Sequence, residues 1–244
     1  PIEDTPAAEA GILAQDLILK IDGNDTKGMN VNDAVELIRG ERGSQVTLTI
    51  ERNGQERDYD IIREKIEIHP VKASLKDTEL GKVGYIRLTT FNEYAARDMQ
   101  KAIKQQEQAN VVGYILDLRS NPGGLLYSSI DIARMWINQG TIVSTVDRQG
   151  ISDRESATNK ALTDKPLVVL IDGGSASASE ILSGALKDNK RATLLGTKTF
   201  GKGLVQSVRP LGDGSGLAVT IAKYLTPNGT DINKAGIPPD VVVK

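Results

Sequence analysis

The fold is indicated most directly by residues 167–182, which read LVVLIDGGSASASEIL. The run begins with an unbroken apolar segment, which is typical of a strand buried on both faces. Two glycines then lead into a pattern that favours a helix from Ser177 to Asn189. A buried strand, a glycine turn and a helix form the repeating unit of α/β sheets, which place their ligands at such turns. The sequence therefore predicts an α/β fold with a candidate site at this turn.

Strands and helices alternate on both sides of this segment, as an α/β domain requires. The predicted strands lie at 83–88, 111–118, 141–146, 192–196, 205–208 and 217–222, and the predicted helices at 92–108 and 128–138. Residues 147–164 are polar and predict a mobile loop. These elements together predict an α/β core over residues 83–244.

A second, smaller module is predicted over residues 1–64. Its expected elements are a helix at 6–10, a strand at 17–21, a helix at 32–39 capped by Asn32, and a hairpin that turns at Asn53 and Gly54. Residues 65–82 then predict a charged connector, which contains the lone His69. The chain should therefore fold as a small module and a larger core joined by this connector.

Composition excludes several classes of function. Lys and Arg total 30 against 32 for Asp and Glu, so the net charge is −2 at pH 7, which argues against nucleic-acid partners. The chain has no cysteine and one histidine, which excludes a cysteine nucleophile and zinc sites built from Cys and His. No apolar run is long enough to span a bilayer, and we expect any targeting segment to precede Pro1. We predict neither a cofactor nor a metal.

Ser177 is a candidate nucleophile, because it stands where the glycine turn meets the helix. A structural interpretation competes with this one, since Ser177 and Glu180 fit a capping box that closes a helix start. The segment is not the Gly-x-Ser-x-Gly elbow of hydrolases, and no histidine lies nearby. Ser175 and Ser179 should point away from Ser177, so we interpret them as turn and helix residues.

A second glycine cluster, GTKTFGKG, occupies residues 196–203. It nearly matches a phosphate-binding loop, but Gly203 stands where Ser or Thr should hold magnesium, and the residues that follow alternate like a strand. Nucleotide binding by Gly196–Lys202 is therefore one alternative, and a solvated turn lysine is another. The third is that Lys202 serves Ser177 as its base, because a lysine kept neutral by burial can replace histidine.

Three ordered motifs carry a resemblance to a known family. They are DLRSNPGG at 117–124, GGSASASE at 173–180 and TFGKGLVQ at 199–206. Together they resemble the carboxyl-terminal processing proteases, also called tail-specific proteases. Residues 1–64 resemble a PDZ domain of the bacterial envelope type, although the family's carboxylate-binding loop and first strand would lie before Pro1. The resemblance implies a PDZ-like module, truncated at its N-terminus, before a protease core of the crotonase-like superfamily.

The resemblance also implies the roles of individual residues. Ser177 would be the nucleophile, Lys202 its base 25 positions later, and Gln206 the residue that supports the lysine. The oxyanion would be met by backbone N–H groups of Ala178 and of the Gly123-Gly124 turn.

Asp188 and His69 are not expected to take part in catalysis. Asp188 would lie about 16 Å along an unbroken helix from Ser177. His69, in the connector before a proline, is expected to be structural.

We therefore expect a serine endopeptidase that cuts proteins near exposed apolar C-termini, which the PDZ module presents. By resemblance it would work in the periplasm, cell envelope or thylakoid lumen. The alternative from a different class is a binding module of the same fold, which would lack the Ser-Lys dyad. The sequence leaves the natural substrate, the oligomeric state and any adaptor open.

Overall fold

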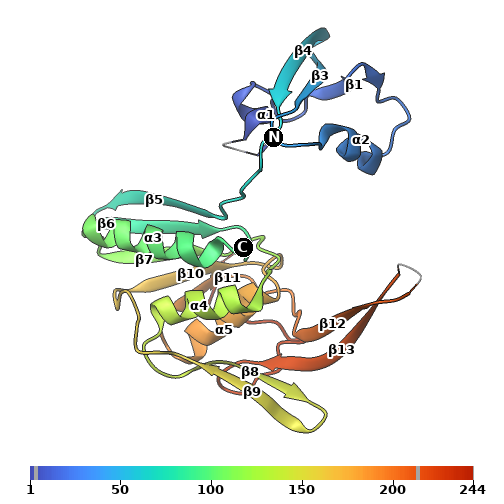
Figure 1. The fold of residues 1–244 in the computed structure, drawn as a ribbon. Coiled ribbons are helices and arrows are strands. Elements are labelled where there is room, and N and C mark those ends of the chain that lie inside the picture. Colours follow the sequence, from blue (N-terminus) through green and yellow to red (C-terminus); the bar gives the residue numbers. More distant parts are fainter. Residues whose placement is uncertain (3–4, 213–214, 244) are drawn as a thin grey trace. The chain divides into compact units, whose positions relative to one another are not determined.

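The computed structural model describes residues 1–2, 5–212 and 215–243. The chain forms two compact units, Pro1–Ile68 and His69–Lys244, which we call the N-terminal and C-terminal units (Figure 1). Each unit has its own hydrophobic core.

The N-terminal unit is a small antiparallel sheet with two short helices. Its elements are α1 (Pro6–Glu9), β1 (Leu17–Ile21), β2 (Asn24–Asp25), α2 (Val31–Ile38), β3 (Gln45–Arg52) and β4 (Gln55–Ile62), with strand order β2-β1-β3-β4. The predicted turn at Asn53 and Gly54 is confirmed, with φ angles of 54° and 75°. Helix α2 is capped by Asn30 and not by Asn32, because the Asn30 Oδ1 atom accepts the N–H groups of Asn32 and Asp33.

The C-terminal unit contains two sheets. The six-stranded sheet has the order β14 (Val241–Val242), β11 (Thr193–Gly196), β10 (Leu167–Ile171), β7 (Gly113–Asp117), β6 (Gly81–Leu88) and β5 (Val71–Thr78). Neighbouring strands from β14 to β6 pair in parallel, and β5 pairs antiparallel to β6. The second sheet is antiparallel, in the order β12 (Leu204–Pro210), β13 (Gly216–Leu225), β8 (Thr141–Asp147) and β9 (Gly150–Ser156).

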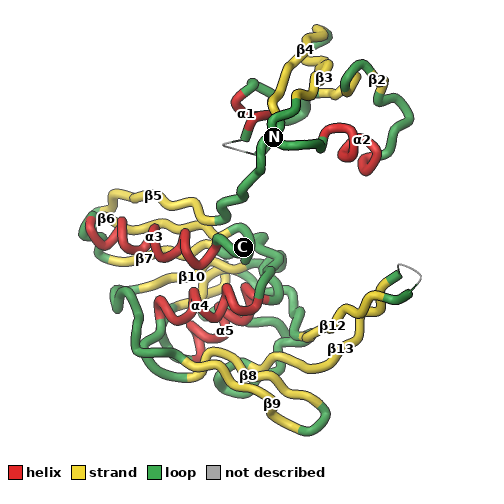
Figure 2. The backbone as a smooth tube through the Cα atoms, in the orientation of Figure 1, coloured by secondary structure: helices red, strands yellow, loops and turns green. Residues whose placement is uncertain are grey.

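Three helices pack against these sheets. They are α3 (Ala95–Gln108), α4 (Leu126–Trp136) and α5 (Ala178–Asp188). Helices α4 and α5 contact each other and also β8, which brings the antiparallel sheet against them (Figure 2). Among the described residues, no helix has both the length and the apolar character needed to cross a bilayer.

Two strands lie where the sequence predicts irregular chain. Strand β5 falls inside the predicted connector at 65–82, and β9 falls inside the predicted loop at 147–164. Both are edge strands, and β5 is exposed along nearly its whole length. Strands of this kind carry charged residues, which protect a free edge, and so lack the apolar alternation that reveals a strand.

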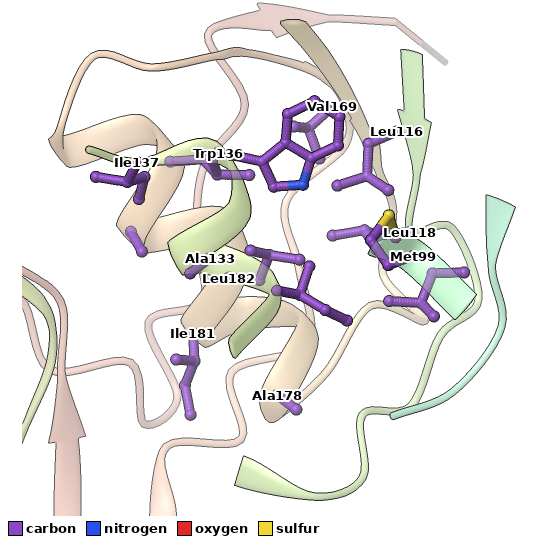
Figure 3. Close-up of a cluster of buried hydrophobic side chains, with 14 of the residues drawn as sticks. Met99, Leu116, Leu118, Ala133, Trp136, Ile137, Val169, Ala178, Ile181 and Leu182 are labelled. Atoms are coloured by element: carbon purple, nitrogen blue, oxygen red, sulfur yellow. The ribbon is translucent and has the colours of Figure 1, made fainter. Parts of the chain in front are cut away.

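The core of the C-terminal unit lies where β7 and β10 pack against α4 and α5. It includes Met99, Leu116, Leu118, Val169 and Leu182 (Figure 3). The ring of Trp136 meets that of Tyr114 edge-on, with 5.1 Å between centroids. This packing holds the parallel strands in place. Because β6, β7, β10 and β11 run in the same direction, the loops that follow them all leave from the same edge of the sheet.

Candidate active site

The three sequence motifs meet at that edge of the sheet. The N–H of Ala176 donates to the carbonyl of Asn121 at 3.0 Å, which joins the loop after β10 to the loop after β7. The N–H of Phe200 donates to the carbonyl of Ser175 at 3.0 Å, which adds the loop after β11. Segments up to 83 positions apart in the sequence, from 117 to 200, therefore build one site.

Ser177 has a backbone conformation that serine rarely adopts. Its φ and ψ angles are 53° and −114°, close to those of the first central residue of a type II′ turn, where glycine is preferred. Such strain typically costs about 1 to 3 kcal/mol and is concentrated at functional sites. The residue is half-buried and immediately precedes α5. The turn therefore holds Ser177 in an accessible position that a relaxed chain would avoid.

The capping box that the sequence predicts is present at the start of α5. In this box the Ser177 N–H donates to Glu180 Oε2 at 2.8 Å. A main-chain bond lies beside it, from the Glu180 N–H to the Ser177 carbonyl, also at 2.8 Å. Ser177 therefore does close the start of α5, as the structural interpretation predicts, and it does so through its backbone. It does not compete with a catalytic role, because the cap is what fixes the residue at the end of the strained turn.

Glu180 also binds the loop that carries Lys202. Its fully buried carboxylate accepts the Thr199 hydroxyl at 2.6 Å, the Gly201 N–H at 2.7 Å and the Lys202 N–H at 2.8 Å. One oxygen, Oε2, therefore holds the backbone N–H of both Ser177 and Lys202. The sequence reveals Glu180 only as a helix cap, because nothing local indicates its partners some 20 positions downstream.

The Lys202 side chain does not have the surroundings that the sequence predicts. We expected burial to keep it neutral, but the side chain is exposed, and its ammonium group has no hydrogen bond or ion pair within the described part of the chain. Gln206 is also exposed, on strand β12, which pairs on one side only. Gln206 lies on an edge strand, and Lys202 lies in the loop that leads into that strand. The structure thus places the Lys202 backbone beside Ser177, while the contact between their side chains stays a prediction.

The predicted oxyanion groups differ in their availability. The Gly123 N–H donates to Asn121 Oδ1 at 2.9 Å, so in this structure it is not free to bind an oxyanion. The N–H groups of Gly124 and Ala178 have no acceptor among the described residues. These two therefore remain as candidate donors.

Gly123 contributes through its lack of a side chain. With φ at 100°, it packs so closely that an added Cβ would lie 2.9 Å from Ser177 Cβ and 2.7 Å from the Ala176 carbonyl oxygen.

We expect Gly123→Ala to lower kcat/KM by about 10²-fold, since displacing a nucleophile by about 1 Å can have that effect. The matched control is Gly173→Ala in the same site, where an added Cβ meets nothing within 4 Å. Steady-state kinetics of both variants on one peptide would check this. Equal activity of the two variants would contradict a catalytic effect of the close contact between Gly123 and Ser177.

Two other serines of the turn have structural roles, as predicted. The Ser175 hydroxyl donates to the Leu118 carbonyl at 2.8 Å, and the Ser179 hydroxyl donates to the Asn121 carbonyl at 2.9 Å. Asn121 is itself fully buried, and its Nδ2 group donates to the Leu88 carbonyl at 2.8 Å. The sequence motif marks this asparagine as a turn residue only, whereas it connects the loop after β7 with the end of β6 and with the turn before α5.

A buried acidic group stabilises the loop after β7. Asp117 accepts two hydrogen bonds from the Arg119 guanidinium, at 2.9 and 2.7 Å, and one from the Tyr85 hydroxyl at 2.6 Å. Burial raises the pKa of Asp117, but the bonds from Arg119 and Tyr85 outweigh it and hold this pKa below its ordinary value. The carboxylate therefore stabilises the fold above its unfolded-state pKa of about 4, and that stabilisation is lost as pH falls through the lower folded-state pKa.

We expect Asp117→Asn to lower the free energy of unfolding at pH 7 by about 2 to 3 kcal/mol, because Arg119 is half-exposed and water partly screens the pair. The difference from the parent should shrink when urea unfolding is repeated at pH 3. Asp131→Asn, which removes a surface pair with Arg134, should change stability by less than about 1 kcal/mol. A difference for Asp117→Asn that grew at low pH would contradict the assignment.

Two further residues lie outside the site. The His69 Nδ1 atom is 2.7 Å from Asp98 Oδ2, and its ring packs against Tyr94, so the imidazole is bound to the α3 region. Helix α5 runs unbroken to Asp188, whose carboxylate accepts the Asn228 N–H at 2.9 Å. Within the described residues, no group of three or more potential ligand side chains is placed to hold a metal.

The structure contradicts the nucleotide-binding alternative for Gly196–Lys202. A phosphate-binding loop opens a helix and presents free N–H groups, but this loop leads into strand β12. The N–H groups of Phe200, Gly201 and Lys202 are already bonded, to Ser175 and to the buried Glu180 carboxylate. A carboxylate at this position would repel a phosphate.

Comparisons with known proteins agree on both units. Residues 82–243 match the model of peptidase family S41, and residues 1–52 match a PDZ domain model. A carboxyl-terminal-processing protease of Synechocystis is 51% identical over the whole chain, which spans 58% of that protein. The carboxyl-terminal-processing peptidase 2, chloroplastic, of Arabidopsis thaliana is 45% identical over 96% of the chain and 47% of that protein. A solved structure, the photosystem II D1 C-terminal processing protease, aligns with all of the chain and 67% of its own, with a TM-score of 0.70 and 41% identity.

Proposed function

We propose that the chain acts as a serine endopeptidase that cuts proteins near their C-termini. The chain belongs to peptidase family S41, together with the carboxyl-terminal processing proteases. The observation that carries this proposal is the Glu180 carboxylate, which ties the strained turn at Ser177 to the backbone of Lys202. A helix cap alone needs no such link to a distant lysine.

In the proposed reaction, Ser177 Oγ attacks the scissile carbonyl carbon and its proton passes to Lys202 Nζ. The N–H groups of Ala178 and Gly124 stabilise the negative oxygen that forms. The C–N bond then breaks, the leaving amine takes the proton from Lys202, and the acyl group stays on Ser177. Water, deprotonated by Lys202, hydrolyses the ester and restores the serine. Gln206 would support the lysine in these steps.

This reaction requires the Lys202 side chain to turn from its exposed position toward Ser177. The change is a rotation of a flexible four-carbon stem, since Glu180 already fixes the backbone at Lys202.

We further propose that residues 1–64 present substrate tails to the core at 83–244. The N-terminal unit has a pocket of about 420 Å³ with mainly apolar walls. Its lining includes Ile38, Val46, Leu48, Ile61 and Ile66. An apolar C-terminal side chain is the complement of such a pocket. By analogy with cyanobacterial and chloroplastic relatives, we propose the periplasm, cell envelope or thylakoid lumen as the place of action.

The test is incubation of the chain with an unstructured protein that ends in apolar residues, followed by mass spectrometry of the products. The matched substrate has the same sequence with acidic residues at the tail. We expect cleavage near the apolar C-terminus, slower cleavage of the acidic version, and a kcat/KM that rises from pH 6 to 10, as general-base catalysis by an amine requires. Binding of the tail without any cleavage would favour the non-catalytic binding module.

A further inference from the structure

The two phenylalanines of the chain have opposite surroundings. The side chain of Phe91 is 1% exposed, whereas that of Phe200 is 68% exposed. Exposing a large aromatic ring to water forgoes the favourable burial that such side chains normally achieve. The exposed ring belongs to the loop that also carries Lys202, two positions further on.

The exposure of Phe200 is imposed by a rigid backbone. Its N–H is bonded to the Ser175 carbonyl, and the next N–H, of Gly201, is bonded to Glu180 Oε1 at 2.7 Å. The Lys234 N–H donates to the Gly201 carbonyl at 2.8 Å, and an added Cβ on Gly201 would lie 3.0 Å from the Lys234 backbone. The backbone that carries the Phe200 ring is therefore held by the same loop contacts that hold the backbone of Lys202.

Exposed apolar side chains also lie where the loop after β7 enters α4. Leu125 and Tyr127 follow Gly124, and their side chains are 36% and 57% exposed. Their position is fixed by the Leu125 N–H, which donates to the Phe91 carbonyl at 2.6 Å. Gly123, in the same segment, packs against Ser177, and the N–H of Phe200 is bonded to Ser175. Two segments that contact the turn at Ser177 therefore expose apolar side chains.

We propose that Phe200 is a specificity-determining residue, whose ring binds an apolar substrate side chain next to the scissile bond, with Leu125 and Tyr127 on the other side. This inference rests on the proposed function and deepens it. In this inference, the C-terminal unit selects the substrate side chain next to the scissile bond. That selection is separate from any recognition of the tail by the N-terminal unit. Covering a preformed apolar surface contributes favourably to the free energy of binding. An extended peptide bound at Ser177 would supply the side chain that covers it.

The experiment uses two peptides with the same apolar tail that differ only beside the cleavage point, one with leucine and one with asparagine. We expect the parent to prefer the leucine peptide in kcat/KM, and Phe200→Ala to reduce this preference by about 10- to 100-fold. Phe200→Leu should restore most of it, because it retains an apolar side chain. The matched control is Leu80→Ala, which removes an exposed apolar side chain from the turn between β5 and β6 and should leave the preference unchanged.

A second measurement separates this inference from the proposed function. In the Ser177→Ala background, the ratio of Kd values for the two peptides measures the same preference without cleavage, and Phe200→Ala should reduce that ratio too. If the parent cleaves but Phe200→Ala leaves both ratios unchanged, the inference is wrong and the proposed function stands. If the parent cleaves neither peptide, the proposed function is wrong, while the Kd ratios still decide whether Phe200 selects apolar side chains.

Discussion

Replacing Ser177 by alanine is expected to lower kcat/KM by on the order of 10⁴-fold or more, because without the hydroxyl no acyl-enzyme can form. The fold should be retained, since the backbone N–H of residue 177 still donates to Glu180. Cleavage of a quenched fluorescent peptide gives the rate, and mass spectrometry of a rapidly quenched reaction detects the acyl-enzyme in the parent only. A matched control is Ser183→Ala on the same helix, whose buried hydroxyl has no partner among the described residues.

Lys202→Ala should be about as inactive as Ser177→Ala. When two groups act as a unit, removing either one removes most of the rate enhancement that they produce together. Lys202→Arg separates base catalysis from positive charge, since arginine stays protonated and cannot accept the serine proton. We expect the arginine variant to be inactive across pH 6 to 10. Activity in that variant would show that Lys202 contributes charge alone, and parent-like activity in both Ser177 and Lys202 variants would exclude the dyad.

The second large effect is expected for Glu180→Gln. Glutamine keeps one carbonyl oxygen, but its NH₂ group would face N–H or O–H donors where the carboxylate now accepts four hydrogen bonds. Leaving buried donors unpaired should lower the free energy of unfolding by about 2 to 4 kcal/mol. Displacing both the turn at Ser177 and the loop at Lys202 should lower kcat/KM by on the order of 10³-fold.

Two measurements distinguish positioning from stability alone. Urea unfolding gives the change in stability, and kcat/KM is measured where the variant is still fully folded. If Glu180 positions the dyad, activity is lost in the folded variant and the rise of kcat/KM with pH is altered as well. A folded variant with parent-like kinetics would limit Glu180 to a structural role. Glu79→Gln, in the exposed turn before β6, is the control that changes the same charge elsewhere.

The sequence predicts those parts of the fold that depend on local patterns. The apolar run at 167–171 and the Asn53-Gly54 pair indicate their strand and turn because burial and turn geometry act over a few residues. Strands β5 and β9 could not be predicted in this way. They are stabilised by pairing with a neighbouring strand, and their own sequences have little apolar content.

The same limit applies to the candidate site. The sequence marks Ser177 as a candidate nucleophile through its turn and its motif, both of which are local. The wider role of Glu180 depends on partners near residue 200, and the engagement of the Gly123 N–H depends on how the Asn121 side chain folds back. The burial expected for Lys202 is wrong for this structure, because a chemical requirement for a neutral base does not determine the rotamer of a side chain in an exposed loop.

The strained turn at Ser177 has an evolutionary consequence. Its φ and ψ angles suit glycine, so Ser177→Gly would relieve strain while removing the hydroxyl. Chains selected for thermal resistance alone would drift toward glycine here, and only selection for turnover can retain serine. Within this lineage, we expect a glycine at position 177 to mark a descendant that has lost catalytic activity and gained stability.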